Sequence, residues 1–291
     1  MSDLAHAAQR ANSAVQRQVS IERNDAIARD TFRVRLHCPD IAARAVPGQF
    51  VMVRLPQGND PLLGRALAVY DVGLSPAGPP TTIDLVYLAL GKLTRRLAQA
   101  LPGQLLEVWG PLGNGFPVVA CEHLVMVAGG VGQTPFLALA KEHTGRQRFG
   151  DPPRVVAPVK RITLCYGAQS GDFLSCVGDF VDCGVSVQLA TDDGTCGYHG
   201  FVTVLLERLL AEGTRGVQVV SCGPGAMMRQ VAEITGRHDV PCLVSLETPM
   251  ACGLGICFTC VAKVRAPVDD TWDYRRTCVD GPVFDARSVV W

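Results

Sequence analysis

Hydrophobic and polar positions follow two different rhythms along the chain, and the change falls near residue 117. Before it, short segments alternate apolar and polar residues, the pattern of strands with one buried face. We expect six such strands, at residues 18–23, 31–37, 49–55, 66–71, 82–89 and 105–109. Proline and glycine pairs separate them, and one helix is expected at 94–100. The pattern predicts a small antiparallel β-barrel.

After residue 117, apolar runs alternate with helical patterns. We expect strands at 123–128, 161–166, 185–190, 217–222 and 242–246, and helices at 134–142, 172–182, 201–211 and 224–236. This alternation predicts an α/β domain with a doubly wound parallel sheet. The longest apolar run, 124–140, is interrupted by three glycines and a proline, so it indicates a buried strand, a turn and a helix, not a membrane span.

The composition supports a well-packed globular protein of several domains. The 291 residues are 48% hydrophobic and carry a net charge of +0, which gives no electrostatic reason to expect nucleic acid or an anionic membrane as partner. We expect a leader at 1–14, a barrel domain at 15–116, an α/β domain at 117–241 and a small C-terminal domain at 242–291.

The most specific motif is a set of four cysteines in the C-terminal segment. They are Cys252, Cys257, Cys260 and Cys278, spaced C-x4-C-x2-C with the fourth after seventeen intervening residues. This is the ligand spacing of a plant-type [2Fe–2S] cluster. Gly253 and Gly255 allow positive φ, so that backbone N–H groups can approach the sulfurs. A four-cysteine zinc site normally uses two C-x2-C pairs, and only one is present, so we predict the cluster.

The other eight cysteines show no repeated spacing, and several lie in apolar segments typical of buried thiols. They are Cys38, Cys121, Cys165, Cys176, Cys183, Cys196, Cys222 and Cys242. No export signal is recognised in the sequence, and a thiolate cluster suits a reducing compartment. We therefore expect a cytoplasmic protein.

Three stretches of the α/β region carry candidate nucleotide chemistry. A G-x-G-x-x-P turn, residues 130–135, follows the first strand, where glycines let the backbone approach a phosphate at a helix start. Asp192 and Asp193 follow the third strand. If they form the loop beside the adenosine ribose, their charges would repel a 2′-phosphate and favour NAD(H) over NADP(H). The alternative is a plain turn. Cys222 ends the fourth strand, at the edge of the sheet where ligands bind. The alternative is a structural role as a buried thiol before a turn.

Two stretches of the barrel region also suggest chemistry. Arg65 begins an apolar strand, where its planar fork could bind a pyrophosphate, although such an arginine is more often a solvated surface residue. Residues 109–116 form a Gly/Pro-rich turn, which by itself fits a loop that joins two domains.

Taken together, these parts and their order resemble the ferredoxin-NADP reductase superfamily. Within it, residues 250–257 and 278–284 resemble the electron-transfer subunits of class 1B dihydroorotate dehydrogenases, and the resemblance covers nearly the whole chain. It implies FAD on the barrel, NAD(H) on the α/β domain and the [2Fe–2S] cluster at the C-terminal end. The cluster ligands it implies are the four cysteines of the motif.

The resemblance also assigns the other site residues. The implied flavin contacts are Arg65, Ala66, Leu67, Ala68, Leu85, Val86, Tyr87, Leu93, Thr94, Gly115 and Phe116. The implied nicotinamide-nucleotide contacts are Gly129, Gly130, Gly132, Pro135, Gly223 and Pro224, with Cys222 as the catalytic residue facing the nicotinamide, and Asp192 joins them if the loop after the third strand is the ribose loop. The chain departs from the family pattern at Ala68, where a hydroxyl is usual, at Leu93, where a glycine is usual, and in the Gln133-Thr134 filling of the turn.

The implied activity is a relay of electrons between NAD(H), FAD and the cluster, and onward to a partner. That partner is an FMN-bearing catalytic subunit that oxidises dihydroorotate to orotate in pyrimidine biosynthesis, in a heterotetramer of two subunits of each kind. This chain itself would not bind dihydroorotate. The same architecture is similar to the small subunits of NADH-dependent ferredoxin:NADP oxidoreductases, hydrogenases and sulfite reductase. A non-catalytic, metal-bearing interaction module is the other alternative.

Overall fold

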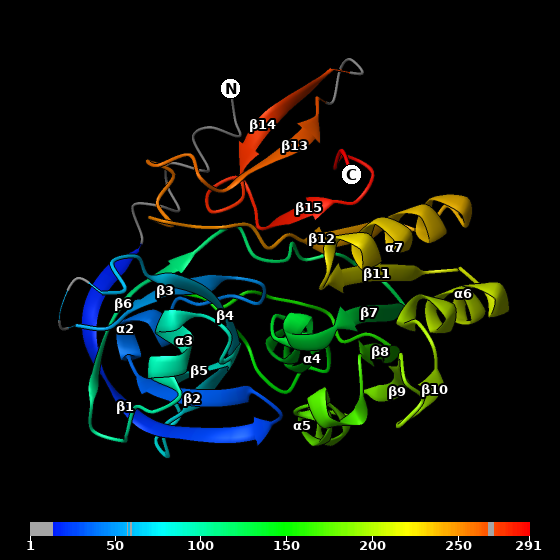
Figure 1. The fold of residues 1–291 in the computed structure, drawn as a ribbon. Coiled ribbons are helices and arrows are strands. Elements are labelled where there is room, and N and C mark those ends of the chain that lie inside the picture. Colours follow the sequence, from blue (N-terminus) through cyan, green and yellow to red (C-terminus); the bar gives the residue numbers. More distant parts are fainter. Residues whose placement is uncertain (1–13, 57, 59, 267–270) are drawn as a thin grey trace.

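The computed structural model describes residues 14–56, 58, 60–266 and 271–291. The expected leader, except for its last residue, therefore lies outside the described residues. The described chain forms a closed barrel, a seven-stranded sheet beside it, and a two-stranded hairpin that projects from the top of the view in Figure 1. All three parts are connected in the order that the sequence predicts.

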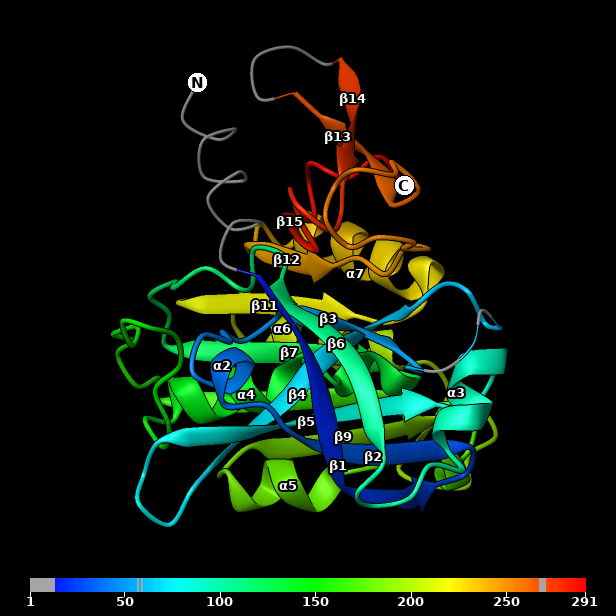
Figure 2. The ribbon, with the colours of Figure 1, turned by 90° about the vertical axis from the view of Figure 1, so that its left-hand side faces the viewer.

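The first part of the chain forms an antiparallel barrel, which confirms the β-barrel predicted there. Its strands are β1 (Val15–Ala28), β2 (Thr31–His37), β3 (Phe50–Arg54), β4 (Arg65–Leu74), β5 (Pro80–Leu88) and β6 (Leu105–Leu112). They close in the order β1-β2-β5-β4-β3-β6, and Figure 2 shows the long β1 crossing the front of the barrel. The short helices α2 (Pro39–Ala42) and α3 (Lys92–Leu97) lie in the connections.

Along each strand, every second side chain points into the barrel, and these side chains fill its interior. In β2, Val34 and Leu36 are fully buried inside, whereas Arg33 and Arg35 project outward. Because side chains alternate across a strand, each barrel strand presents a second set of residues to its surroundings. On β4 and β5 this second set faces the α/β sheet and the C-terminal segment, and it is the surface on which the site is built.

The sheet confirms the predicted α/β architecture. Its strands are β7 (His123–Gly129), β8 (Arg161–Ala168), β9 (Ser186–Thr191), β10 (Tyr198–His199), β11 (Val217–Cys222), β12 (Cys242–Ser245) and β15 (Val283–Asp285), in the order β10-β9-β8-β7-β11-β12-β15. All pairs are parallel except β12 with β15. Helices α4 (Phe136–His143) and α5 (Val177–Asp182) cover one face, and α6 (Val202–Glu212) and α7 (Gly225–Arg237) cover the other.

Several observed elements differ from the expected ones, and α2 and the two strands at 261–265 and 272–276 were also not expected. The single helix expected at 172–182 is divided into a turn of 3₁₀ helix, η2 (Gly171–Phe173), and α5, because Cys176 has a left-handed φ of 60° that interrupts a continuous helix. Strands β10 and β15 were not expected, since two or three residues are too few to show a period. A further 3₁₀ turn, η1 (Gly130–Gln133), precedes α4.

A buried histidine at the start of β7 makes stability depend on pH. His123 Nε2 lies 2.9 Å from Thr163 Oγ1, and Arg161 Nη2 lies 2.9 Å from His123 Nδ1. Burial, and after it the Arg161 charge, lowers the pKa of His123 from 6.5 to about 4. Between about pH 4 and 6.5 the unfolded chain therefore binds a proton at His123 that the folded protein does not. The free energy of unfolding consequently falls as the pH falls from 6.5 toward 4.

We expect a His123→Gln variant to lose much of this dependence. Denaturant titrations between pH 4 and 6.5 should give a shallower rise of the unfolding free energy with pH than in the wild type. Equal slopes for the two proteins would contradict the assignment.

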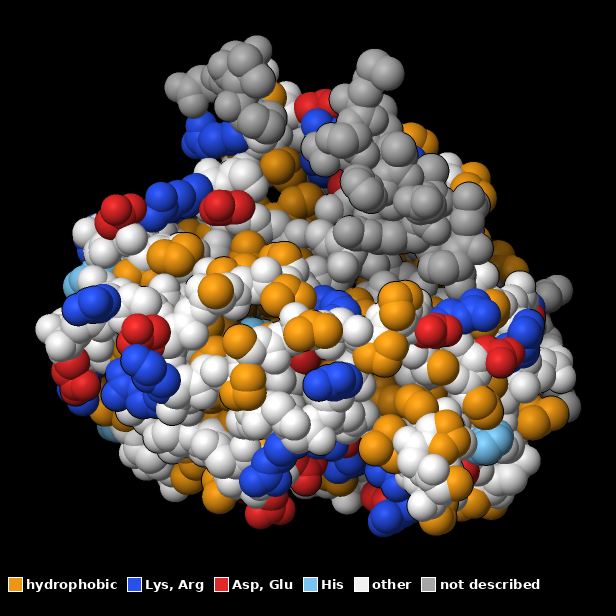
Figure 3. All heavy atoms as spheres, turned by 180° about the vertical axis from the view of Figure 1, so that it is seen from behind, with side chains coloured by type: hydrophobic (Ala, Val, Ile, Leu, Met, Phe, Trp, Pro, Cys, Tyr) orange, Lys and Arg blue, Asp and Glu red, His pale blue; other side chains and the backbone are white. Residues whose placement is uncertain are grey.

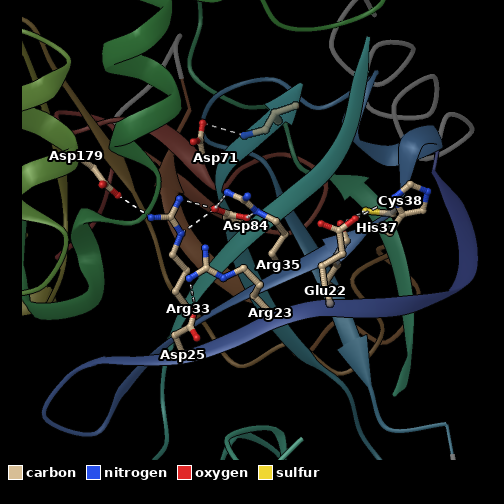
Figure 4. Close-up of polar contacts among 12 residues, drawn as sticks. Glu22, Arg23, Asp25, Arg33, Arg35, His37, Cys38, Asp71, Asp84 and Asp179 are labelled. Atoms are coloured by element: carbon tan, nitrogen blue, oxygen red, sulfur yellow. Dashed lines mark hydrogen bonds and ion pairs between the residues drawn. The ribbon is translucent and has the colours of Figure 1, made fainter. Parts of the chain in front are cut away.

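An ion cluster joins the barrel to the α/β sheet (Figure 4). The Asp84 carboxylate on β5 is only 1% exposed and accepts hydrogen bonds from Arg33 Nε and Arg35 Nε, both at 2.7 Å. Arg33 Nη1 also donates to Asp179 Oδ2 of α5 at 2.8 Å, and the hydroxyl of Tyr70 on β4 donates to the same oxygen at 2.7 Å. These contacts fix β4 against α5.

The hairpin consists of β13 (Val261–Arg265) and β14 (Trp272–Arg276). Its inner residue Val264 packs on the core beneath α6 and α7, while Trp272 and Tyr274 are exposed. On the face seen from behind in Figure 3, acidic and basic side chains are interspersed among hydrophobic ones, consistent with the neutral composition. Within the described ranges, no helix has the length and apolar character needed to cross a membrane.

Candidate functional site

The first three cysteines of the motif lie in one loop, residues 252–260, here called the cysteine loop. It follows β12 and leads directly into β13, while Cys278 lies in the turn after β14. Gly253 and Gly255 have φ of +73° and +79°, which confirms the predicted need for left-handed backbone at both glycines. The loop and the turn meet, and all four thiols come from these two segments.

Two of the four thiols form a close pair. Cys260 Sγ lies 3.2 Å from Cys278 Sγ, and both cysteines are buried. Hydrogen bonds, chiefly from Thr259, lower the pKa of the exposed Cys257 to about 6. Burial, together with the neighbouring Cys260 thiol, raises the pKa of Cys278 above its usual value. Cys257 is therefore exposed and easily ionised, whereas Cys260 and Cys278 are buried.

These residues fit a [2Fe–2S] cluster. A backbone N–H group already points at sulfur, since Leu254 N donates to Cys252 Sγ at 3.3 Å. Among the described residues, no group of three or more His, Cys, Asp or Glu side chains is gathered so as to hold a metal ion. The close Cys260–Cys278 pair fits the two thiolates of one iron, which leaves Cys252 and Cys257 for the other.

The cysteine loop is packed on the barrel. Trp109 of β6 donates from Nε1 to the Cys252 carbonyl at 2.8 Å. A Cβ on Gly253 would lie 2.6 Å from Met52 Cγ and 2.9 Å from Leu112 Cδ1, so only glycine allows this approach. Sequence reasoning did not identify Trp109 or Met52, because nothing local connects β3 and β6 with a loop 140 or more residues later.

The buried thiols share one apolar cluster with the strand next to β4. Cys260 and Cys278 are buried together with Phe50, Met52 and Leu112, and Ala66, Trp109, Met250 and Val279 pack against this group. Phe50 pairs with Ala68 and Met52 pairs with Ala66 across the β3–β4 ladder. The predicted flavin stretch 65–68 is therefore one strand away from the residues that cover two of the thiols.

The predicted flavin residues of β4 and β5 are divided between two faces. Arg65 is exposed at the start of β4, and Ala66, Ala68 and Val86 lie on the outer side of the barrel. The side chains of Leu67, Leu85 and Tyr87 instead belong to the barrel core, where the Tyr87 hydroxyl donates to Asn24 Oδ1 at 3.0 Å. For these three residues only the backbone is available to a ligand on the outer face.

The remaining predicted flavin residues have identifiable structural roles. Leu93 and Thr94 lie in the first turn of α3, where Leu93 is buried and the Thr94 hydroxyl accepts a hydrogen bond from Gly91 N at 3.0 Å. Gly115 has φ +67°, and a Cβ there would lie 2.8 Å from the Pro47 carbonyl. Phe116 is buried between the barrel and α4, against Phe136. Gly115 and Phe116 therefore shape the turn after β6, whereas Leu93 and Thr94 begin α3 before that strand.

The glycines of the nucleotide turn have different roles. A Cβ on Gly132 would lie 2.3 Å from the Cys222 carbonyl oxygen, and a Cβ on Gly223 would lie 2.9 Å from Gly129 N. These three glycines let the turns after β7 and β11 pack directly on each other. Gly130 differs: its φ is +55° and no atom lies within 4 Å of a Cβ placed there. The space in front of Gly130 is therefore open to a ligand, and η1 also contacts β5 of the barrel.

Other predicted nucleotide residues lie around this turn. Pro135 immediately precedes α4, which begins at Phe136. Gln133 is fully buried, and no described residue forms a hydrogen bond with its amide. Asp192 is exposed after β9, and Asp193 beside it accepts hydrogen bonds from Thr195, which lower the pKa of Asp193. Those bonds close a local turn at the place expected for the ribose.

Cys222 ends β11 beside the open turn, with Gly223 and Pro224 directly after it. Burial raises the pKa of its thiol to about 12, and the Glu247 carboxylate acts in the same direction. Ser245 forms a hydrogen bond with the thiol and weakly opposes the shift. The thiol is therefore neutral at ordinary pH, so it can donate a hydrogen bond but does not supply a thiolate nucleophile.

Asn114 connects the turn after β6 to the C-terminal segment and was missed by sequence reasoning. Its backbone N donates to the Gly281 carbonyl at 2.7 Å, and its Nδ2 donates to the Val283 carbonyl at 2.7 Å. Val283 N donates back to Asn114 Oδ1 at 3.1 Å. An asparagine inside the glycine-rich turn is the only local signal of this role. The contacts bring β15 and the Cys278 turn against the barrel.

Comparison with known proteins identifies the same parts. The family described as the iron-sulfur cluster binding domain of dihydroorotate dehydrogenase B matches residues 247–290. A protein of Desulforamulus reducens named dihydroorotate dehydrogenase B (NAD(+)), electron transfer subunit, is 34% identical over 267 residues, which cover 91% of this chain and 94% of that protein. A protein of the same name from Geobacillus sp. (strain WCH70) is 32% identical, covering 94% of this chain and 98% of its own.

Solved structures support the fold. The structure of an NADH-dependent reduced ferredoxin-NADP oxidoreductase, described for flavin-based electron bifurcation, has a TM-score of 0.77 and 28% identity, and the match covers 94% of this chain and 90% of that one. Phthalate dioxygenase reductase, described as transferring electrons from pyridine nucleotides to [2Fe–2S], has a TM-score of 0.59 at 17% identity and 86% coverage of this chain. The second likeness concerns the fold alone.

Proposed function

The chain belongs to the family of electron transfer subunits of dihydroorotate dehydrogenase B, and on this premise we propose that it connects NAD(H) to a catalytic partner subunit through FAD and a [2Fe–2S] cluster. When bound, FAD exchanges a hydride with NAD(H) and single electrons with the cluster, so the cofactors supply the redox chemistry. The chain's own residues supply binding, distance and electrostatics.

One observation carries the proposal: three separate binding features converge on the outer face of β4 and β5. The open turn at Gly130 contacts β5, the exposed Arg65 begins β4, and the thiols of Cys260 and Cys278 lie against β3, the neighbour of β4. This order supports a relay in which the nucleotide turn, the flavin strands and the cluster lie side by side. A relay needs such short distances between its stations.

Each residue has a proposed role. Arg65 pairs with the flavin pyrophosphate through its planar guanidinium. Gly130 lets the nucleotide phosphates approach the backbone, and Asp192 lies beside the adenosine ribose. The neutral Cys222 thiol faces the nicotinamide, and Cys252, Cys257, Cys260 and Cys278 ligate the cluster.

We also propose the division of labour among the domains. Residues 15–116 bind FAD and residues 117–241 bind NAD(H). Residues 242–291 hold the cluster and contribute β12 and β15 to the sheet of the NAD-binding part. We place the protein in the cytoplasm, supported by all twelve cysteines being free thiols in the structure.

The nucleotide turn can be tested by a single added methyl group. Gly132→Ala would place Cβ 2.3 Å from the Cys222 carbonyl, a backbone atom that cannot rotate away. We expect the affinity for NADH to fall about tenfold or more, as overpacking costs of 1–3 kcal/mol imply. Gly236→Ala in α7, with nothing within 4 Å of its Cβ, is the control and should bind NADH normally. Unchanged binding by Gly132→Ala would contradict the assignment.

The proposed partner is an FMN-containing catalytic subunit, two copies of which assemble with two copies of this chain. Its docking face is the exposed surface of the cysteine loop, where Ile256 is 76% exposed and Phe258 is 63% exposed. Such large apolar side chains beside a redox centre suit a surface that is covered in the complex.

An Ile256→Glu variant tests this face. We expect electron delivery to the partner subunit to fall about tenfold or more, because a charge would be buried in the interface. NADH-driven reduction of a small one-electron dye should continue at the wild-type rate. If the variant and the wild type reduced the partner subunit at the same rate, this face would be excluded as the docking surface.

The proposed function as a whole is tested by purifying the chain anaerobically with iron and riboflavin supplied. We expect a flavin and cluster spectrum, about one FAD and two irons per chain, and reduction of a one-electron dye by NADH. A colourless protein that holds zinc and no flavin would refute it and favour the non-catalytic module. The partner is identified by copurification from the native source.

One alternative within the redox class has its own support. The match to the NADH-dependent reduced ferredoxin-NADP oxidoreductase structure, at 28% identity over 94% of the chain, allows a ferredoxin-linked complex. Copurification distinguishes the two functions, because a partner that carries several [4Fe–4S] clusters and no FMN would replace the dihydroorotate dehydrogenase assignment.

A further inference from the structure

Arg276, the last residue of β14, reaches across to the cysteine loop. Its Nη1 donates to the Gly255 carbonyl at 3.1 Å, and its guanidinium lies 5.2 Å from the centre of the Phe258 ring. A Cβ on Gly255 would lie 3.2 Å from Arg276 Nη1, so the glycine permits this close approach. The guanidinium therefore contacts the loop on both sides of Cys257.

Gly255 lies between Arg276 and the turn after β14. Its carbonyl accepts a hydrogen bond from Arg276 Nη1, and a Cβ on Gly255 would lie 2.6 Å from Val279 Cγ2. The next residue, Thr277, acts on the C-terminal end of the loop, since Thr277 N and Oγ1 donate to the Cys260 carbonyl at 2.8 and 3.0 Å. Arg276 and Thr277 thus hold the middle and the C-terminal end of the cysteine loop.

The positively charged end of the Arg276 side chain points toward the cysteine loop. Its Nε lies 3.7 Å from Asp280 Oδ2, so the ion pair is loose, while the Nη1 end points at the loop. The side chains are 27% and 18% exposed, so water screens this charge only in part. A positive charge that contacts the loop between the first and third cysteine ligands favours the more negative, reduced form of a bound cluster.

We propose that Arg276 is a positioning residue that holds the cysteine loop around Gly255 and raises the reduction potential of the cluster, an inference that rests on the proposed function. Asp280 opposes it electrostatically. Removing the guanidinium shifts the midpoint potential to more negative values, because it leaves Asp280 without its counter-ion. Removing the Asp280 charge shifts the potential in the opposite direction. A purely structural role for Arg276 predicts no such opposite pair of shifts.

The experiment compares cluster midpoint potentials of the intact flavin- and cluster-loaded protein by spectroelectrochemistry, with the EPR spectrum of the reduced cluster as a second readout. The variants are Arg276→Gln, Arg276→Lys and Asp280→Asn. Arg275→Gln is the matched control, since alternation places Arg275 on the opposite face of β14, paired with Ala262.

We expect a negative shift in Arg276→Gln, a smaller negative shift in Arg276→Lys, a positive shift in Asp280→Asn and no shift in Arg275→Gln. Shifts of the same sign in Arg276→Gln and Asp280→Asn, or equal shifts in the two arginine variants, would overturn the inference. If Arg276→Gln does not retain the cluster, Arg276→Lys and Asp280→Asn still decide the sign. A wild-type protein without a cluster would refute the proposed function itself, which is a distinguishable failure.

Discussion

A Cys278→Ser variant is expected to lose the visible and EPR signals of the iron–sulfur cluster while it retains the flavin absorption. Cys278 is 2% exposed and its sulfur lies 3.2 Å from Cys260 Sγ, so removing it breaks the buried thiol pair. A serine hydroxyl does not replace the soft thiolate that iron–sulfur centres require. Of the predicted flavin residues on β4 and β5, only Ala66 packs against the cluster of buried residues that contains Cys278, so flavin should remain.

The measurement is a visible spectrum with iron and flavin quantified for the purified variant. Cys165→Ser is the matched control, because Cys165 is equally buried, in β8, and lies outside the motif. It should retain both chromophores even if its stability falls. A full complement of iron in Cys278→Ser would show that the fourth ligand has been misassigned.

The second large effect concerns stability and the contact between the barrel and the α/β sheet. Asp84→Asn removes the negative charge that two arginines share, and leaves Arg33 and Arg35 close together with only Asp179 to compensate (Figure 4). Breaking a buried charge pair by removing one partner costs about 3 kcal/mol or more. We expect a loss of about that size in the free energy of unfolding, measured by denaturant titration.

Two controls separate the ion cluster from a general effect of replacing an acid. Asp182→Asn, on the exposed side of α5, should change the unfolding free energy little. Arg35→Met in the Asp84→Asn background removes one of the uncompensated cations and should recover part of the loss. An Asp84→Asn protein as stable as the wild type would contradict the interpretation.

The sequence by itself determined the architecture and the chemistry of the metal site. Period-two alternation before residue 117 and alternating strands and helices after it are local patterns, so they predicted the barrel and the parallel sheet. The spacing of the four cysteines, with Gly253 and Gly255 between the first two, is also local. It predicted both the cluster and the left-handed backbone that the structure shows at these glycines.

The sequence did not determine which of the predicted flavin residues face the barrel core and which face outward. Leu85 and Val86 are neighbours in the chain, yet one faces the barrel core and the other the α/β sheet. Alternation predicts that they point in opposite directions, but only the closed barrel decides which face is inside. The same applies to Tyr87, whose hydroxyl is bound to Asn24 and not directed at the outer surface.

Only the tertiary structure decided how the stations of the relay meet. The contacts of Trp109 with Cys252, Asn114 with Val283 and Arg33 with Asp179 join residues more than 140 positions apart. Such contacts depend on strand order, register and the packing of one domain on another, and no local period or spacing encodes them. The chain's motifs therefore specify which groups are held, while packing between distant segments specifies the distances over which electrons pass.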